Sequence, residues 1–162
     1  GKTTLSSEIF TLLSDKYDIE YIDGDEYRKL WKTPMSFSKV DRDINVNCMG
    51  MIAHFLNKNG TNVIIASISP YQSMREFNRE LIKCTESEYF HVHVQCDIDT
   101  LKKRDTKGLY KQTDIKLTGV DDPYETPENA DITVNTALHS IDTCIQNILL
   151  SLAQKGIIGL VI

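Results

Sequence analysis

The chain begins with Gly1, Lys2, Thr3 and Thr4, directly before a segment of helical periodicity. Backbone amides at a helix N-terminus bind phosphate groups, a lysine beside them reaches the β- and γ-phosphates of a nucleotide, and a hydroxyl group reaches Mg²⁺. The four residues match the end of the phosphate-binding motif G-x-x-x-x-G-K-[ST]. Four residues also match by chance, so the motif has to be judged with the rest of the chain.

Two carboxylates, Asp23 and Asp25, stand at the end of a predicted strand. Ligands bind open α/β sheets at the carboxyl ends of the strands. There the pair could hold Mg²⁺ through water and accept the proton of a substrate hydroxyl. The alternative is a simple turn with Asp25 as a helix N-cap, because Asp-Gly-Asp is also good turn chemistry.

Arg42 and Asn45 lie three residues apart in a predicted helix and therefore share a face. With Arg28 they could form a cationic surface for a phosphate-like anion. The alternative is ordinary surface salt bridging, which contributes little energy.

Ser69 follows the most apolar predicted strand and is expected at the same sheet edge as the carboxylates. Pro70 fixes the turn after it. Arg75 and Arg79 follow at a spacing of one helical turn, and solvent exposure is the simplest expectation for both.

A long irregular stretch, 107–129, is rich in Gly, Pro and Asp, and cations precede and enter it. Loops of this length in compact domains are often lids or binding loops. A lid that closes over ATP can supply cations to a transferring phosphoryl group. The alternative is a solvated helix end.

His91 and His93 alternate on a predicted strand and lack partners at metal-ligand spacing, so a structural role is expected.

Helices and strands alternate along the chain. Helices are predicted at 4–16 (apolar residues Leu5, Ile9, Leu12 and Leu13), 39–58 (Val40, Ile44, Cys48, Met51, Ile52, Phe55 and Leu56), 71–84 (Met74, Phe77, Leu81 and Ile82), from 97, and at 138–153. Strands are predicted at 18–23, 61–69, 89–96 and 130–136. This alternation predicts βαβ units and an α/β fold with a parallel sheet.

Composition limits the classes of function. The length of 162 residues suggests one domain. The formal charge of -5 argues against a nucleic-acid partner, whose binding depends on cations. No apolar run approaches the roughly 18 residues of a membrane span, so no membrane partner is expected. The four cysteines lie apart in apolar runs, which predicts buried free thiols in a reducing cytoplasm.

These motifs occur together in a particular order. The segments GKTTL, DGDEYR, FSKVDRDIN, ISPY, RDTKGLYK and TGVDDPYETPENAD closely resemble the adenylylsulfate (APS) kinase family, from Gly1 to about Thr136. The resemblance implies a P-loop kinase fold, three-layered α/β/α with a central parallel sheet and a short lid at 107–129. The missing first strand and first glycine of the motif are then expected upstream in the natural protein.

The resemblance also implies an activity: Mg²⁺-dependent transfer of the ATP γ-phosphate to the ribose 3′-hydroxyl of a small nucleotide acceptor, by an enzyme that is a homodimer. The residue roles are carried over by position. Lys2, Asp23 and Asp25 would be catalytic, with Thr3 and Asp23 serving Mg²⁺. ATP would be bound by Gly1, Lys2, Thr3, Thr4, Arg104 and Thr136. The acceptor would be bound by Asp25, Arg28, Phe37, Arg42, Asn45, Ser69, Lys107 and Leu109.

Two departures from the family pattern remove positive charge. Asn47 and Cys48 replace two arginines, and the segment after KGLYK is shorter and lacks another. Less positive charge suggests a less anionic acceptor. Cytidine diphosphoramidate kinase of bacterial capsule synthesis, a relative with a neutral nitrogen in the acceptor, is therefore an alternative to the family's main activity. An inactive, nucleotide-binding regulatory homologue is a second alternative.

Overall fold

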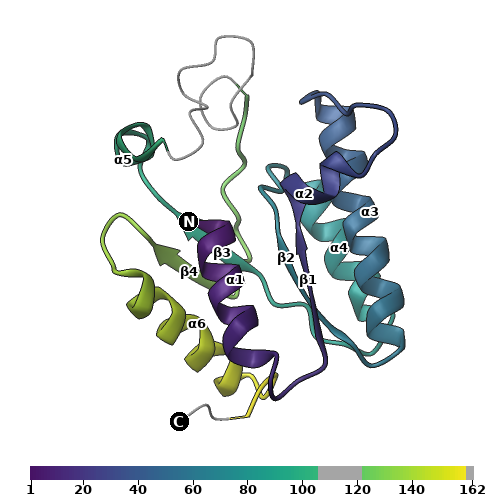
Figure 1. The fold of residues 1–162 in the computed structure, drawn as a ribbon, viewed down its shortest axis with the longest axis vertical. Helices are drawn as coiled ribbons and strands as arrows, with labels where there is room; N and C mark the ends of the chain where they lie inside the picture. The colour runs from purple at the N-terminus through teal and green to yellow at the C-terminus, as the bar shows by residue number, and fades with distance from the viewer. Residues whose placement is uncertain (106–121, 160–162) are drawn as a thin grey trace. The chain divides into compact units, whose positions relative to one another are not determined.

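The computed structural model describes residues 1–105 and 122–159, and helices and strands alternate along them as predicted (Figure 1). The elements are α1 (Lys2–Leu13), β1 (Ile19–Asp23), α2 (Gly24–Lys29), α3 (Lys39–Lys58), β2 (Asn62–Ala66), α4 (Gln72–Lys83), β3 (Val92–Gln95), α5 (Ile98–Arg104), β4 (Ile132–Asn135) and α6 (Ile141–Gln154). The short helix α2 lies where the sequence suggested a helix only in the alternative reading of Asp25 as an N-cap. The chain forms two compact units: an N-terminal unit, Lys2–Tyr89, and a C-terminal unit made of Gly1 and the described residues from Phe90 onward.

The N-terminal unit is built on a parallel pair of strands, β1 and β2, in which Ile19 faces Asn62 and Asp23 faces Ala66. Helix α1 packs on one side of the pair, and α3 and α4 pack together on the other (Figure 1). The core between strands and helices contains Val46, Met49, Tyr71 and Met74. Because the two strands are parallel and in register, their carboxyl ends lie side by side, as the sequence predicted for Asp23 and the residues after β2.

Side-chain caps set where the helices of this unit begin. Ser38 is the N-cap of α3 and accepts a hydrogen bond from the backbone amide of Asp41. Asp23 is the N-cap of α2 and accepts from the amides of Asp25 and Glu26. The prediction of Ser38 as a cap is confirmed. The alternative reading of Asp25 as an N-cap is wrong, because the carboxylate two residues earlier already satisfies the first amides of the helix.

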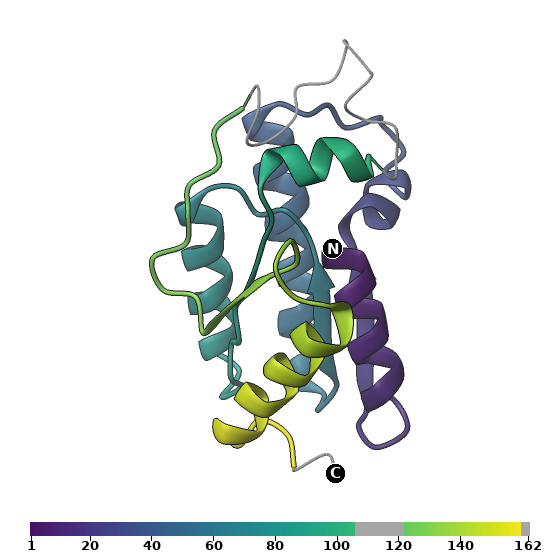
Figure 2. The ribbon, with the colours of Figure 1, turned by 90° about the vertical axis from the view of Figure 1, so that its left-hand side faces the viewer.

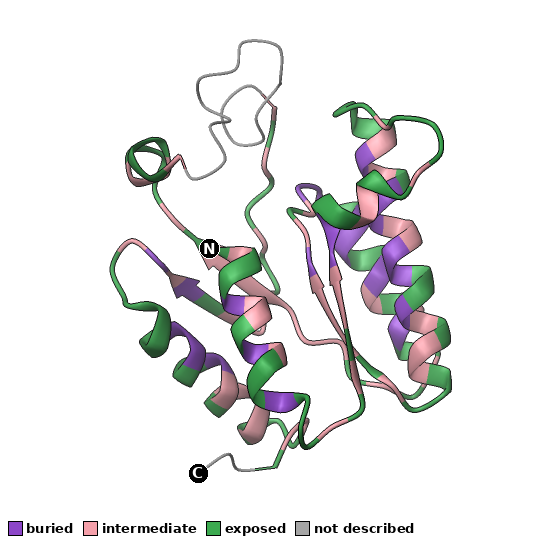
Figure 3. Cartoon of the chain, in the orientation of Figure 1, coloured by how far each residue is buried: buried purple, intermediate pink, exposed green. Residues whose placement is uncertain are grey.

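The apolar periodicity that predicted α3 marks its exposed face (Figure 3). Val40, Ile44, Met51 and Phe55 are 66%, 42%, 45% and 65% exposed. The buried face carries a mixed set instead, namely Arg42, Asn45, Val46, Met49, Gly50 and Ala53. Two further residues of predicted apolar faces, Leu12 in α1 and Phe77 in α4, are also exposed.

Gly50 allows the mixed face of α3 to pack closely against α4. A Cβ atom at Gly50 would lie 1.6 Å from Oδ1 of Asn78 in α4. The absent side chain therefore lets the two helices pack closely where a larger residue would hold them apart. Asn78 is itself buried, and its Nδ2 donates to the carbonyl of Met74.

The C-terminal unit contains a second parallel pair, β3 and β4, in which Val92 faces Ile132 and Gln95 faces Asn135. Helix α6 packs on β4 (Figure 2). Asp131 accepts a hydrogen bond from the amide of His91 and forms an ion pair with Lys155. Parallel pairing is therefore confirmed in both units, whereas one central sheet within a single domain stays a prediction.

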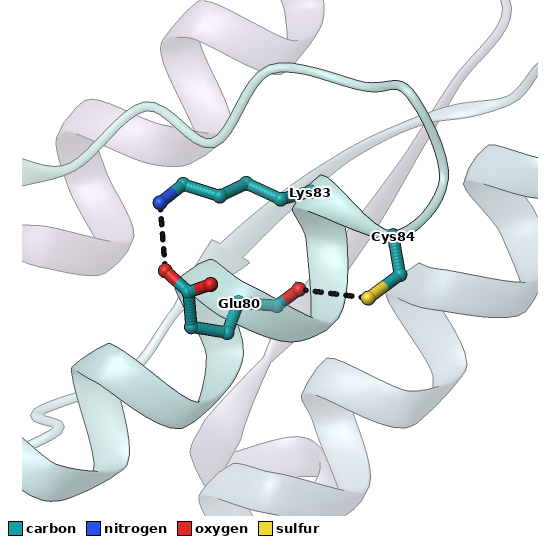
Figure 4. A network of polar contacts seen from close by, with 3 residues as sticks. All are labelled: Glu80, Lys83 and Cys84. Atoms are coloured by element: carbon teal, nitrogen blue, oxygen red, sulfur yellow. Dashed lines mark hydrogen bonds and ion pairs between the residues drawn. The ribbon is translucent and has the colours of Figure 1, made fainter.

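The four cysteines are free thiols of different burial. Cys144 is fully buried, Cys48 and Cys96 are half-buried, and Cys84 is exposed. The prediction of buried thiols is wrong for Cys84, because α4 ends there and turns its last side chains to the surface. Figure 4 shows this end: the thiol donates to the carbonyl of Glu80, whose carboxylate pairs with Lys83.

Residues 1–105 and 122–159 hold no group of three or more metal-binding side chains of the His, Cys, Asp or Glu type. His93 stacks on Tyr124 instead, with 6.0 Å between ring centroids. Within the same ranges, every helix is too short or too polar to cross a membrane.

Candidate active site

Asp23 joins three elements at the carboxyl end of β1. Asp23 is buried, with only 7% of its surface exposed. One carboxylate oxygen, Oδ1, accepts from the backbone amides of Asp25 and Glu26 at 2.9 and 3.2 Å. The other, Oδ2, accepts from the hydroxyl of Thr3 at 2.9 Å. The two residues predicted to serve Mg²⁺ are thus in direct contact, and they present the hydroxyl and carboxylate oxygens that this ion prefers.

The N-terminus of α1 has the features expected of a phosphate-binding end. Lys2 is the first helical residue, and the first turn contains no acidic side chain. The turn itself therefore contributes no carboxylate that would compete with an incoming anion at the positive end of the helix dipole; the nearby carboxylate of Asp23 contacts Thr3 from β1. Lys2 is half-buried, whereas Thr3 and Thr4 are exposed.

Arg28 and Arg42 lie around one aromatic ring, that of Phe37. The guanidinium carbons are 4.8 and 5.5 Å from the ring centroid. Arg28 also donates to the carbonyl of Ser36 at 2.7 Å, and Arg42 donates to the carbonyl of Phe37 at 2.8 Å. Three residues predicted to bind the acceptor are therefore gathered from α2, α3 and the segment between them.

The electrostatics of this cluster favour an anion. Burial, and then the nearby charge of Arg42, hold the pKa of Arg28 below its ordinary value. Two cations so close together repel each other, and a bound anion relieves that repulsion. Arg42 is only 5% exposed, so the alternative of ordinary surface salt bridging is wrong for this residue. Phe37 is 40% exposed and can offer its ring to a base.

Asn45 lies one turn after Arg42 on the same face of α3, as predicted, and is 3% exposed. Its Oδ1 has no hydrogen-bond partner among residues 1–105 and 122–159. A buried acceptor without a donor costs about 1–3 kcal/mol. The cost is removed when a ligand donates a hydrogen bond there, so the orphan oxygen supports a binding role for Asn45.

Ser69 lies just beyond the end of β2, in the loop that begins next to Asp23 of the neighbouring strand. Its φ of 42° is in the left-handed region, which residues other than glycine seldom occupy. Its hydroxyl is 2.6 Å from that of Ser67.

The expectation of solvent exposure is wrong for Arg75, which is 4% exposed. Arg79 is half-buried, and its guanidinium lies over the ring of Tyr89.

The C-terminal unit brings together the two other residues predicted for ATP. Arg104 of α5 donates to the carbonyl of Thr136 at 2.8 Å, directly after β4. Gly1 approaches the same residue, because a Cβ atom built on it would lie 3.1 Å from Cγ2 of Thr136. Lys107 and Leu109 lie outside the described residues, as does most of the predicted lid 107–129.

Tyr21 is a site residue that the sequence analysis did not predict. Its hydroxyl is 3.2 Å from that of Ser6 and 3.5 Å from Oδ2 of Asp23. Burial raises its pKa, the hydrogen bond with Ser6 opposes that change, and the negative charge of Asp23 adds to it. Tyr21 and Asp23 are two apart in a strand and so share a face, which is the signal that could have found it.

Comparison with known proteins agrees with this geometry. A family model described as adenylylsulphate kinase matches residues 1–135. The chain is 36% identical to an adenylyl-sulfate kinase of Myxococcus xanthus over 98% of this chain and 88% of the relative.

The chain belongs to the adenylylsulphate kinase family. It is therefore an ATP-dependent phosphotransferase of the adenylyl-sulfate kinase type, as the resemblance of the motifs predicted.

Solved structures of the adenylylsulphate kinase family confirm the α/β P-loop kinase fold. The Mycobacterium tuberculosis APS kinase CysC, in complex with AMPPNP and APS, superposes with a TM-score of 0.86 at 27% identity, covering 94% of this chain and 90% of that one. A hexameric APS kinase from Thiobacillus denitrificans superposes with a TM-score of 0.74 at 27% identity, covering 99% of this chain and 28% of that one.

Proposed function

We propose that this chain transfers the γ-phosphate of ATP to the ribose 3′-hydroxyl of adenylylsulfate, with Mg²⁺. The observation that carries the proposal is the contact between Thr3, in the first turn of α1, and Asp23, at the end of β1. It joins a phosphate-binding helix end to a buried carboxylate. The M. tuberculosis relative was solved with AMPPNP and APS, an ATP analogue and the proposed acceptor.

Different residues would bind the phosphates, the base and the Mg²⁺ ion of the ATP complex. Lys2 and the amides of Gly1, Thr3 and Thr4 would bind the phosphates, while Arg104 and Thr136 would lie near the base. Thr3 and Asp23 would hold Mg²⁺, which neutralises charge on the transferring phosphoryl group when bound. Asp23 is positioned for this by its cap on α2, which aims one oxygen at the helix and leaves the other toward Thr3.

The acceptor would lie on the cationic cluster. Phe37 would stack on the base, Arg28 and Arg42 would bind the anionic end, and the orphan oxygen of Asn45 would accept a hydrogen bond. Asp25 is exposed in the first turn of α2, two residues after Asp23. It would take the proton of the 3′-hydroxyl as the new O–P bond forms and the bond between the γ-phosphorus and ADP breaks.

The test is an assay of ADP release by the natural full-length protein with ATP and Mg²⁺. Adenylylsulfate and cytidine diphosphoramidate are offered separately, and Lys2→Ala is the inactive reference. Turnover with adenylylsulfate that is abolished in Lys2→Ala, with an unchanged circular dichroism spectrum, supports the proposal. Normal activity of Lys2→Ala would remove this helix end from the mechanism.

One observation favours the cytidine compound as a second candidate acceptor. Asn47 and Cys48 stand where the resemblance leads us to expect arginines, and Oδ1 of Asn47 is buried without a hydrogen-bond partner in the described part of the chain. A neutral donor on the acceptor, such as an amidate nitrogen, suits such an oxygen better than an anionic sulfate does. Turnover with this compound alone would establish the alternative. Tight nucleotide binding without turnover on either acceptor would indicate a regulatory homologue.

We further propose that the enzyme acts in the cytoplasm as a homodimer that pairs through the exposed face of α3. Val40, Ile44, Met51 and Phe55 are spaced by four, seven and four residues, so the face is the same from either end. A two-fold axis at its centre would place Val40 against the partner's Phe55 and Ile44 against the partner's Met51. All four are large apolar residues that are 42–66% exposed, and contiguous exposed apolar patches often mark interaction sites.

Sedimentation velocity tests the dimer directly. We expect wild-type protein to sediment as a dimer and Ile44→Glu as a folded monomer, because the change places two carboxylates in an apolar contact. Leu150→Glu, at an apolar residue of α6 that is 56% exposed, is the control and should remain dimeric. A dimer that survives Ile44→Glu would exclude this face as the interface.

A further inference from the structure

The loop after β2 contains a strained residue beside the proposed site of phosphoryl transfer. Ser69 has a φ of 42°, and side-chain-bearing residues adopt this left-handed conformation only at a cost in free energy. The strand before it ends at Ala66, which faces Asp23 across the parallel pair. A strained backbone persists only where neighbouring groups hold it in place.

Arg75 of α4 is the group that holds Ser69. One guanidinium nitrogen donates to the carbonyl of Ser69 at 2.8 Å. Two others, Nε and a terminal nitrogen, donate to the same oxygen of Gln72 at 3.2 and 2.6 Å. The side chain is 4% exposed, so its orientation is fixed both by packing and by this forked contact.

The same loop packs against the first residue of α2. A Cβ atom at Gly24 would lie 3.2 Å from the carbonyl oxygen of Ala66 and 3.3 Å from Cβ of Ser67. Ser67 is in turn joined to Ser69 through their hydroxyls, 2.6 Å apart. The part of the loop that packs on Gly24, the residue between Asp23 and Asp25, is thus only two residues from Ser69, and the short backbone between them links the two positions.

We propose that Arg75 is a positioning residue for phosphoryl transfer. By holding the carbonyl of Ser69, it keeps the loop 67–69 in its left-handed form and seated on Gly24. That arrangement fixes where the acceptor hydroxyl meets Asp25. The inference rests on the acceptor site proposed above and assigns to the buried arginine a task that involves no contact with the substrate.

A double-mutant cycle separates this task from a general role in stability. Arg75→Lys is made in two backgrounds, Ser69→Ala and Ser69→Gly, which both lack the serine hydroxyl. Glycine adopts the left-handed conformation without strain, whereas alanine does not. Lysine keeps the charge but cannot make the forked contact.

We expect Arg75→Lys to lower kcat/KM for the acceptor by about tenfold or more in the Ser69→Ala background and by less than about threefold in the Ser69→Gly background. The loss should be in kcat/KM for the acceptor and not in KM for ATP. Arg79→Lys, one turn further along α4, is the matched control and should leave both constants unchanged. Equal losses in the two backgrounds would overturn the proposal.

Crystal structures of the two double variants provide a readout that does not depend on turnover. We expect Ser69→Ala/Arg75→Lys to lose the positive φ at position 69 and Ser69→Gly/Arg75→Lys to keep it. Where Arg75→Lys does not fold, Gln72→Ala removes the amide that orients the guanidinium and takes its place in the cycle. A positive φ retained in both variants would refute the positioning role, whereas a wild-type protein inactive on adenylylsulfate would refute the proposed function alone.

Discussion

Both faces of α3 depart from the usual amphipathic pattern. The buried face carries the core residues Val46 and Met49, but also the polar residues Arg42 and Asn45 and the small residues Gly50 and Ala53. The opposite face carries large apolar side chains that are 42–66% exposed, such as Val40, Ile44 and Phe55. A helix normally buries its apolar stripe because that burial is the main source of its stability.

Each face departs from the ordinary rule for a separate reason. The buried polar residues hold an aromatic ring and an unpaired amide oxygen ready for a ligand, whereas the small residues let α4 approach. The exposed apolar residues lack cover within the described chain, and we proposed above that a second copy covers them. Departures from the local rules of folding are expected at functional surfaces. The contrast between its two faces therefore leads us to propose two functional surfaces on α3.

The largest expected effect contrasts one substitution on each face. Ala53→Glu puts a carboxylate at a position that is 4% exposed, and should lower the free energy of unfolding by more than about 3 kcal/mol. Met51→Glu, at a position 45% exposed, should change it by less than about 1 kcal/mol in dilute monomer. Urea unfolding followed by circular dichroism measures both. Equal costs would mean that the faces are assigned wrongly.

Arg42→Ala tests whether the buried polar residues serve a ligand. We expect acceptor affinity to fall by about 1.5–3 kcal/mol, because a charge-assisted hydrogen bond is lost. Isothermal calorimetry with adenylylsulfate measures the change, and Lys58→Ala at the far end of α3 is the control cation. Unchanged binding in Arg42→Ala would return Arg42 to a purely structural role.

Gly50→Ala tests the close approach of α3 and α4. The added methyl group would overlap Oδ1 of Asn78, so we expect a loss of about 1–3 kcal/mol in stability. The double variant Gly50→Ala/Asn78→Ala removes the overlapping atom and should cost less than the sum of the two single changes. Strictly additive costs would show that the helices are not in contact at this point.

Asp41→Asn gives the smallest effect and a pH dependence. The hydroxyl and amide of Ser36 donate to the carboxylate and hold the pKa of Asp41 below its ordinary value of 3.8. A lowered pKa contributes stability above 3.8 that is lost as the pH falls through the folded value. The melting temperature of Asp41→Asn should therefore be below that of wild type at neutral pH and converge with it in acid. A constant difference, or an equal effect of Asp43→Asn, would contradict this assignment.

Much of the fold could be predicted from the sequence. The order of helices and strands, the parallel pairing, and the placement of Asp23 at one strand end and Ser69 beyond another follow from periodicity and from the rule for ligand sites in α/β folds. The shared face of Arg42 and Asn45 also follows from spacing alone, whereas the end of α1 as a phosphate site rests on the resemblance of the whole chain and stays a prediction.

The rest could not be predicted, because it depends on tertiary contacts. The periodicity of α3 establishes a helix, but which face is buried depends on the approach of α4 at Gly50. The burial of Arg75 and the left-handed backbone of Ser69, whose carbonyl it contacts, have no local sequence signal. Asp23 is the cap of α2, whereas the sequence suggested only Asp25 for that role.

Asp23 has two structural roles, because one carboxylate oxygen caps α2 and the other accepts a hydrogen bond from Thr3. Selection for a stable fold therefore preserves this residue even where selection for activity has ended. Asp25 is exposed and is not the cap of this helix. In a lineage drifting from enzyme to regulator, we expect Asp25 to change first and Asp23 to persist, so retention of Asp23 alone is no sign of an active kinase.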